Sequence, residues 1–221
     1  MKQISERVQM IPALPGRRQL YIGIALLLMV ALGVVAVRRW QPYRYHGIEL
    51  QPSQPVQDFT LETSTGLAMS LSDFRSRFVL LFAGYTHCPD VCPLTLVDLA
   101  ETVRLLGDQA GQVQVLFITV DPERDTPQQL ATYLRYFDST FIGMTGTPAA
   151  IDAAVTQFGI FHSASQGDSG LVDHTNSVVL LDRQGRVRLL FPPGTGAAQM
   201  ADDLRHLMRP PGWWAIALAD R

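Results

Sequence analysis

An apolar run near the N-terminus constrains this chain more than any other feature of its sequence. Residues 20–37, LYIGIALLLMVALGVVAV, are 18 residues without a charge. That length is close to the ~20 residues needed to cross a hydrocarbon core. A helix that is apolar on every face is also unusual in the core of a domain this small. We therefore predict a transmembrane anchor over 20–37, preceded by a cytoplasmic segment over 1–19.

A cleaved signal peptide is the alternative interpretation of this run. Signal peptides usually have a shorter apolar stretch, about 7–15 residues, that ends in a small-x-small cleavage site. Here the run ends at Arg38-Arg39-Trp40, which is the charged and aromatic pattern of a membrane boundary. Four basic residues precede the run and three follow it closely, so charge only slightly favours a cytoplasmic N-terminus.

Charge and composition divide the rest of the chain. Residues 1–44 hold seven of the 18 basic and one of the 20 acidic residues, which leaves 11 basic and 19 acidic residues in 45–221, a net charge of −8. Such an acidic region is a poor candidate for binding nucleic acid. The Pro- and Gln-rich stretch 38–57 is predicted to be a linker, 58–208 a folded domain and 209–221 a C-terminal tail. Trp213-Trp214 in this tail could meet a membrane interface or pack on the domain.

The element pattern of the domain predicts an α/β fold. Residues 78–85 and 113–120 are continuous apolar runs, as expected for strands covered on both faces. Two helix starts are marked by a capping residue and a proline. Thr147 is the predicted cap of one helix, and either Asp125 or Thr126 is the predicted cap of the other. Hairpin turns are expected near Gly66 and Gly185. The remaining helices are predicted over about 94–106 and 196–208. This order predicts a mixed sheet with helices on both faces, as in the thioredoxin-like fold.

The two cysteines of the chain lie close together, just after the first apolar strand. They are Cys88 and Cys92, in GYTHCPDVCPLTL. Pro93 fits best in the first turn of the following helix, which places Cys92 at the helix N-terminus and Cys88 in the loop before it. Backbone N–H groups and the helix dipole favour thiolates there, so we predict that the pKa of both thiols is lowered.

A thiol pair at this spacing can form a disulfide, bind a metal ion or exchange disulfides with a partner. A stabilising disulfide is a weak interpretation, because so small a loop constrains the unfolded chain little. The C-x-x-C spacing of thioredoxin-type enzymes is absent. A peroxiredoxin pattern, P-x-x-x-T-x-x-C, would need Pro and Thr where Leu81 and Tyr85 stand. The three possibilities remain open at this point.

A metal site would need a third ligand, and histidine is the natural one. Two thiolates with one imidazole suit Cu(I), and with a weak extra ligand they can hold Cu(II). His174 ends a Gly/Ser-rich loop and precedes a predicted strand, whereas His87 adjoins Cys88 and is the competing candidate. The histidines of the chain are His46, His87, His162, His174 and His206.

Three strings, GYTHCPDVCPLTL, VDPERDTP and VDHTNSVVLLDRQG, resemble in order and spacing the signatures of the Sco/SenC copper-chaperone family. The resemblance implies a thioredoxin-like domain held at a membrane and facing the bacterial periplasm or the mitochondrial intermembrane space. It also implies that Cys88, Cys92 and His174 bind copper. Asp121 and Asp125 match the second signature, and we interpret them as caps or loop-fixing groups rather than ligands.

The resemblance further implies a metallochaperone, without catalytic turnover, that helps to assemble the binuclear copper centre of cytochrome c oxidase. Its partners would be the copper-bearing oxidase subunit or another copper chaperone, and its location the bacterial inner membrane, with a single pass and the domain in the periplasm. The alternative is a thiol-disulfide reductase that keeps a partner's copper-ligand cysteines reduced through Cys88 and Cys92. A copper- or redox-responsive signalling module would use the same ligands. His174 separates the first two functions, because a dithiol reductase does not need it.

Overall fold

The computed structural model describes residues 16–40, 43–50, 56–163, 173–174 and 176–209, with the backbone alone at 36–40, 162–163 and 173–174. The chain divides into two compact units, Met1–Arg44 and Tyr45–Arg221. Apart from Arg209, the predicted tail with Trp213 and Trp214 lies outside the described residues.

The first unit contains one long helix, α1 (Arg17–Trp40), of 24 residues. It includes the whole uncharged run of residues 20–37. Its stretch Arg17–Val35 has a mean hydropathy of 2.0, and none of its residues is buried in the protein. At 1.5 Å per residue the helix is about 36 Å long, which is enough to cross a bilayer core. The prediction of an N-terminal apolar helix is therefore confirmed, and its place in a membrane stays a prediction.

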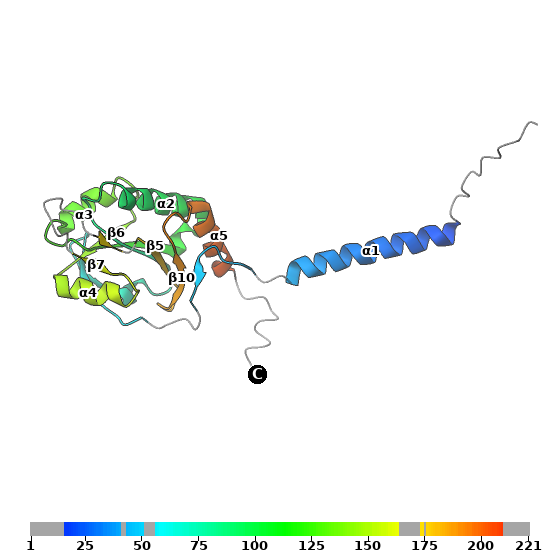
Figure 1. Ribbon diagram of the computed structural model, residues 1–221, viewed down its shortest axis with the longest axis horizontal. Coiled ribbons are helices and arrows are strands. Elements are labelled where there is room, and N and C mark those ends of the chain that lie inside the picture. The colour runs from blue at the N-terminus through cyan, green and yellow to red at the C-terminus, as the bar shows by residue number, and fades with distance from the viewer. Residues whose placement is uncertain (1–15, 41–42, 51–55, 164–172, 175, 210–221) are drawn as a thin grey trace, which may run out of the picture. The chain divides into compact units, whose positions relative to one another are not determined.

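The second unit is built on one mixed sheet of eight strands, in the order β1-β10-β9-β4-β5-β6-β2-β3 (Figure 1). Its central pairs β4–β5 and β5–β6 are parallel, and its other neighbouring pairs are antiparallel. Strands β7 and β8 form a separate antiparallel ribbon. The strands are β1 (Ile48–Glu49), β2 (Thr60–Thr63), β3 (Ala68–Ser70), β4 (Phe78–Gly84), β5 (Val113–Thr119), β6 (Ile142–Thr145), β7 (His162–Ser163), β8 (Asp173–His174), β9 (Val178–Leu181) and β10 (Val187–Phe191).

Helices cover both faces of this sheet, as predicted. Figure 1 shows α2 and α5 over one face and α4 over the other. Thr102 Oγ1 of α2 donates a hydrogen bond to the Ala197 carbonyl of α5 at 3.3 Å, which joins the two helices. The helices are α2 (Val91–Leu106), α3 (Pro127–Leu134), α4 (Pro148–Thr156) and α5 (Ala197–Met208), with 3₁₀ turns η1 (Leu71–Phe74) and η2 (Gly107–Gln112).

The two central strands form the core because they are apolar on both faces. Every residue of β4 and of β5 is buried. Helix α2 adds a buried stripe whose members recur every three or four residues, which is the period of one helix face. Complete burial of one such large apolar side chain stabilises the fold by roughly 1.5–3 kcal/mol. The stripe consists of Cys92, Leu96, Leu99, Thr102 and Leu106.

Both proline-marked helix starts are confirmed. Thr126 Oγ1 accepts from the Gln129 N–H at 3.2 Å, and Pro127 opens α3. Thr147 caps α4 in the same way, accepting from the Ala150 N–H at 3.3 Å. The cap of α3 is therefore Thr126, which leaves Asp125 free for another role.

Both hairpin turns are also confirmed. Gly66, between β2 and β3, has φ +82°, and Gly185, between β9 and β10, has φ +76°. These values lie in the left-handed region that glycine adopts without steric cost. The Gly185 N–H donates to the Asp182 carbonyl at 2.9 Å, which closes the second turn.

Candidate metal centre

The cysteine motif lies in the loop that joins the end of β4 to the start of α2. Cys88 is in this loop and partly exposed, whereas Cys92 is the second residue of α2 and buried. Pro93 follows in the first helical turn, as predicted. Neither cysteine is in a disulfide, and the Cys92 N–H donates to Cys88 Sγ at 3.4 Å. The loop thus holds one sulfur near the surface and the other beneath it.

The two thiols have opposite electrostatic environments. Burial alone would raise the pKa of Cys88, but N–H groups of Asp90, Cys92 and Val91 and the Cys92 thiol favour its thiolate, so the net shift is downward. Burial raises the pKa of Cys92, and the nearby Cys88 and Asp125 raise it further. The prediction of a lowered pKa is therefore confirmed for Cys88 and wrong for Cys92. Desolvation on the buried face of α2 outweighs the helix N-terminus there.

Gly84, the last residue of β4, leaves the space that the Cys92 sulfur occupies. A Cβ atom at this position would lie 2.9 Å from Cys92 Sγ and 2.9 Å from Cε2 of Phe117. Phe117 is fully buried, with its ring centroid 5.9 Å from that of Phe82. The ring therefore has little room to move, and a glycine is required for the sulfur to sit between strand and helix.

Asp125 ties the cysteine loop to the loop that follows β5. Its carboxylate is fully buried. Oδ2 accepts from the Thr86 N–H at 2.9 Å and from Thr119 Oγ1 at 2.7 Å, and Oδ1 accepts from Thr86 Oγ1 at 2.6 Å. Because Thr86 stands two residues before Cys88, the hydrogen bonds to this carboxylate fix the stretch of loop that leads to Cys88. The interpretation of Asp125 as a loop-fixing group is confirmed.

His87, the competing ligand candidate, belongs to the same hydrogen-bonded cluster. Its side chain is 48% exposed, and Nδ1 lies 3.1 Å from Thr86 Oγ1 and 3.7 Å from Asp125 Oδ1. His87, Asp121 and Asp125 lie close enough to hold a metal ion. However, Asp125 already accepts three hydrogen bonds, and Asp121 forms an ion pair with Arg124. This environment is that of a structural network rather than of an open ligand set.

The structure describes the backbone of His174 but not its side chain. His174 ends β8, and four residues later Val178 of β9 pairs with Phe82 of β4. Because β9 runs antiparallel to β4, the chain just before Val178 lies at the carboxyl end of β4. Asn176 in this segment lines a small hollow together with Thr95 of α2. The backbone therefore brings the His174 segment to the sheet edge that carries the cysteines.

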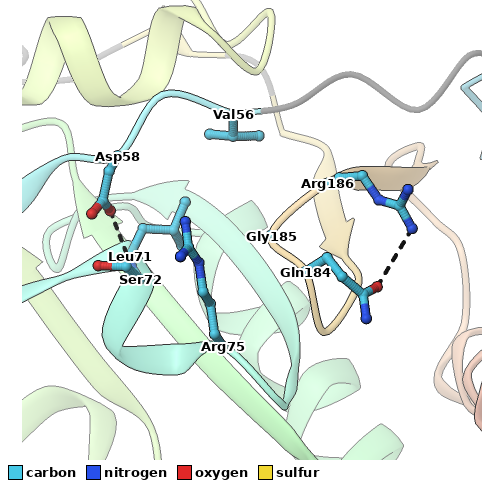
Figure 2. A pocket seen from close by; sticks show the side chains of 8 residues that line it. All are labelled: Val56, Asp58, Leu71, Ser72, Arg75, Gln184, Gly185 and Arg186. Atoms are coloured by element: carbon cyan, nitrogen blue, oxygen red, sulfur yellow. Dashed lines mark hydrogen bonds between the residues drawn. The ribbon is translucent and has the colours of Figure 1, made fainter.

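A second hollow lies at the other end of β4 and offers no metal ligands of this kind. It has a volume of about 110 Å³ and lies between η1 and the β9–β10 turn (Figure 2). Figure 2 shows the Ser72 N–H donating to Asp58 and the Arg186 guanidinium donating to Gln184, at 3.0 and 3.4 Å. Its described lining contains no cysteine or histidine, so the soft donors belong to the cysteine end of the sheet.

Copper fits the donors at that end by their chemistry. Two cysteines four residues apart, in a loop and a first helical turn, with a histidine in the neighbouring segment of the chain, are a donor set that suits Cu(I). The partly exposed sulfur of Cys88 leaves one side of the pair open to a partner.

Comparison with known proteins assigns the chain. The family model described as SCO1/SenC matches residues 49–209. The chain belongs to the SCO1/SenC family. Apo Sco1 from Thermus thermophilus is 38% identical and covers 75% of this chain and 98% of its own, with a TM-score of 0.69. ScoI from Bradyrhizobium japonicum, solved with copper bound, is 35% identical and covers 69% of this chain and 99% of its own, with a TM-score of 0.63. The predicted thioredoxin-like fold is confirmed by these likenesses.

A curated relative of this SCO1/SenC chain is a mitochondrial SCO2 homolog from Bos taurus. The two are 37% identical over 156 residues, which is 68% of this chain and 59% of the bovine protein. This chain therefore spans about 59% of the length of that relative.

Several residues of the centre were missed by sequence reasoning. Gly84 could have been noticed as a glycine that ends an apolar strand just before a cysteine motif. Thr86 and Thr119 carry no signal in sequence, because their role depends on two loops meeting at Asp125.

Proposed function

We propose that this chain is a membrane-anchored copper metallochaperone that assists assembly of the binuclear copper centre of cytochrome c oxidase. Copper is held by Cys88, Cys92 and His174. The observation that carries the proposal is the pair of cysteines, not joined by a disulfide, at the carboxyl end of β4, with the His174 segment at the same sheet edge. Membership of a family with a copper-bound member, ScoI of Bradyrhizobium japonicum, supports copper as the cargo.

The arrangement suits delivery of a metal ion. A Cu(I) ion with two thiolates and one neutral imidazole is well held, yet has room for a further ligand. A partner's thiol or imidazole can approach from the side of Cys88, and copper then passes by ligand exchange. Loading requires both cysteines to be reduced, so metal binding and the redox state of the pair are coupled.

An anaerobic Cu(I) titration of the full-length chain in detergent tests this proposal. With reduced cysteines and a strong competing chelator, we expect one equivalent to bind. Cys88→Ser and His174→Ala should each weaken binding on the order of 100-fold or more, beyond the 10–100-fold typical of losing a group that only supports a ligand. His46→Ala is the matched control and should bind as the parent does, because His46 is exposed and the substitution keeps its backbone N–H, which donates to Asp203.

Two results would redirect the proposal. If tight binding is unchanged in His174→Ala, the third ligand would be His87 or another group. Absence of tight copper binding would favour the reductase, in which Cys88 and Cys92 keep a partner's copper-ligand cysteines reduced. The observation that favours this second function is a reduced cysteine pair in which the pKa of Cys88 is lowered and that of Cys92 is raised.

The domain is proposed to lie in the periplasm, with α1 as a single pass through the bacterial inner membrane. The partly exposed thiol of Cys88, whose pKa is lowered, provides the test, because thiolates react fastest. After removal of copper and mild reduction, we expect a membrane-impermeant maleimide to label Cys88 in intact spheroplasts and to leave the buried Cys92 unlabelled. Mass spectrometry of the peptides reads the result. Labelling that needs permeabilised membranes would place the domain in the cytoplasm.

The partner is proposed to be the copper-bearing subunit of cytochrome c oxidase or another copper chaperone. The net charge of −8 over residues 45–221 is consistent with protein or cation partners rather than nucleic acid.

A further inference from the structure

Tyr133 brings a buried hydroxyl group to the cysteine end of the sheet. It lies in the second turn of α3, the helix that begins two residues after Asp125. Its ring packs against those of Phe117 and Phe137, with centroids 6.2 and 5.2 Å away. The hydroxyl oxygen is buried and has no hydrogen-bond partner among the residues that the structure describes. A phenylalanine would pack here without the cost of a buried, unpaired hydroxyl, so the oxygen calls for a role.

The ring of Phe117 connects Tyr133 to Cys92. Cε2 of this ring and the Cys92 sulfur each lie 2.9 Å from the point that a Cβ atom on Gly84 would occupy, so ring and sulfur are neighbours. Tyr133 packs against the same ring. Burial raises the pKa of the Tyr133 hydroxyl, and Cys92 raises it more than any other charged group near it. The hydroxyl therefore stays protonated at neutral pH and can donate a hydrogen bond.

The Cys92 sulfur is the acceptor near this hydroxyl that has the greatest need of a donor. The carboxylate of Asp125 already accepts three hydrogen bonds. Three backbone N–H groups favour the thiolate of the partly exposed Cys88. For the buried Cys92, the favourable contribution comes from the N–H of Tyr85, and burial outweighs it. A buried anionic sulfur needs hydrogen-bond donors in place of water, and Tyr133 carries one.

We infer that the Tyr133 hydroxyl donates a hydrogen bond to the Cys92 sulfur when that sulfur binds copper. Tyr133 is then a positioning residue, which acts on the metal ion through Cys92 and is not itself a ligand. This inference rests on the proposed function. In the copper-free centre the sulfur belongs to a thiol, which is a weak acceptor, whereas a copper-bound sulfur is a thiolate. Hydrogen bonds to charged acceptors are the stronger ones, so copper binding gives the hydroxyl its partner.

Tyr133→Phe tests the inference, because it removes the oxygen and keeps the ring. The matched control is Tyr136→Phe, three residues later in the chain, where the side chain is 82% exposed. A Cu(I) competition titration of the full-length chain in detergent should show affinity lowered roughly 10–100-fold in Tyr133→Phe and unchanged in the control. The melting temperature of copper-free Tyr133→Phe should equal or exceed that of the parent, because an unpaired buried hydroxyl is lost. A tyrosine that only stabilised the fold would give a lower melting temperature and a parent-like affinity.

Infrared difference spectra between the copper-free and Cu(I)-loaded forms report on the hydrogen bond itself. A phenol band shifts when its hydroxyl gains an acceptor. We expect copper loading to produce such a shift in the parent and in Tyr136→Phe, and to produce none in Tyr133→Phe.

The outcomes separate this inference from the proposed function. The inference holds only if the affinity loss and the phenol shift both appear. If either is missing while the parent still binds Cu(I) tightly, the role of Tyr133 is overturned and the copper chaperone is left intact. If the parent fails to bind Cu(I) tightly, or if binding survives Cys88→Ser, both are overturned.

Discussion

Replacing Gly84 by alanine is expected to lower the stability of the domain by about 1–3 kcal/mol and to weaken copper binding at the same time. The added Cβ would lie 2.9 Å from both Cys92 Sγ and the buried Phe117 ring. The ring is confined by Phe82 and by Tyr133, whose centroid is 6.2 Å away, so the sulfur at the start of α2 must move instead. Thermal unfolding followed by circular dichroism and the Cu(I) titration measure the two effects.

Gly111→Ala is the matched control, because a Cβ there meets nothing within 4 Å and the residue does not need a positive φ. Its stability should stay within about 0.5 kcal/mol of the parent. A double-mutant cycle with Cys92→Ala sharpens the test, since removal of the sulfur should reduce the cost of Gly84→Ala. A parent-like melting temperature and copper affinity in Gly84→Ala would show that the strand end is not tightly packed.

Asp125→Ala is expected to destabilise the domain by about 3–4 kcal/mol, because several buried donors lose their acceptor together. The Thr86 N–H, the Thr86 hydroxyl and the Thr119 hydroxyl all donate to this carboxylate. Asp125→Asn keeps one acceptor oxygen and should fall between the parent and the alanine variant. Urea unfolding at neutral pH measures the series, with the slope of the transition checked for two-state behaviour.

Asp202→Ala provides the comparison for a surface carboxylate. Its side chain is 57% exposed and forms an ion pair with Arg205 within one turn of α5. Such pairs contribute about 0–1 kcal/mol, so this variant should unfold close to the parent. Equal losses at Asp125 and Asp202 would mean that the buried network does not fix the cysteine loop.

Much of the fold could be predicted because its strongest signals are local. The strands β4 and β5 are long apolar runs, and the starts of α3 and α4 carry a capping threonine followed by proline. By contrast, β1 has two residues and β6 has four, too few to show a period of two. Strand β6 also contains Gly143, where a Cβ would lie 2.8 Å from Leu130 Cβ of α3. Close helix packing thus selects a residue that weakens the strand signal.

The position of the cysteine pair in the fold was predictable from the sequence, but the electrostatics of the two thiols were not. The cysteine spacing and Pro93 placed the pair correctly at the loop and first turn. The pKa of Cys92 was predicted in the wrong direction because a helix N-terminus is visible in sequence, while the depth of burial follows from the packing of α2 on β4. The stripe of Cys92 with Leu96 and Leu99, at helical spacing, was the available clue. The backbone pairing of His162 with His174 depends on a ribbon of two-residue strands, and strands this short cannot be predicted from a local sequence pattern.

The unequal exposure of the two sulfurs determines which of them a partner contacts first. A partner protein that approaches from solution contacts Cys88 first, whether it carries a metal-accepting side chain or a disulfide. In the proposed copper transfer, Cys88 would be the ligand exchanged early, and Cys92 would release the ion last. In the alternative thiol exchange, Cys88 would form the mixed disulfide and Cys92 would resolve it. The same asymmetry, created by the glycine that lets Cys92 pack against the sheet, would give the two proposed chemistries the same first step.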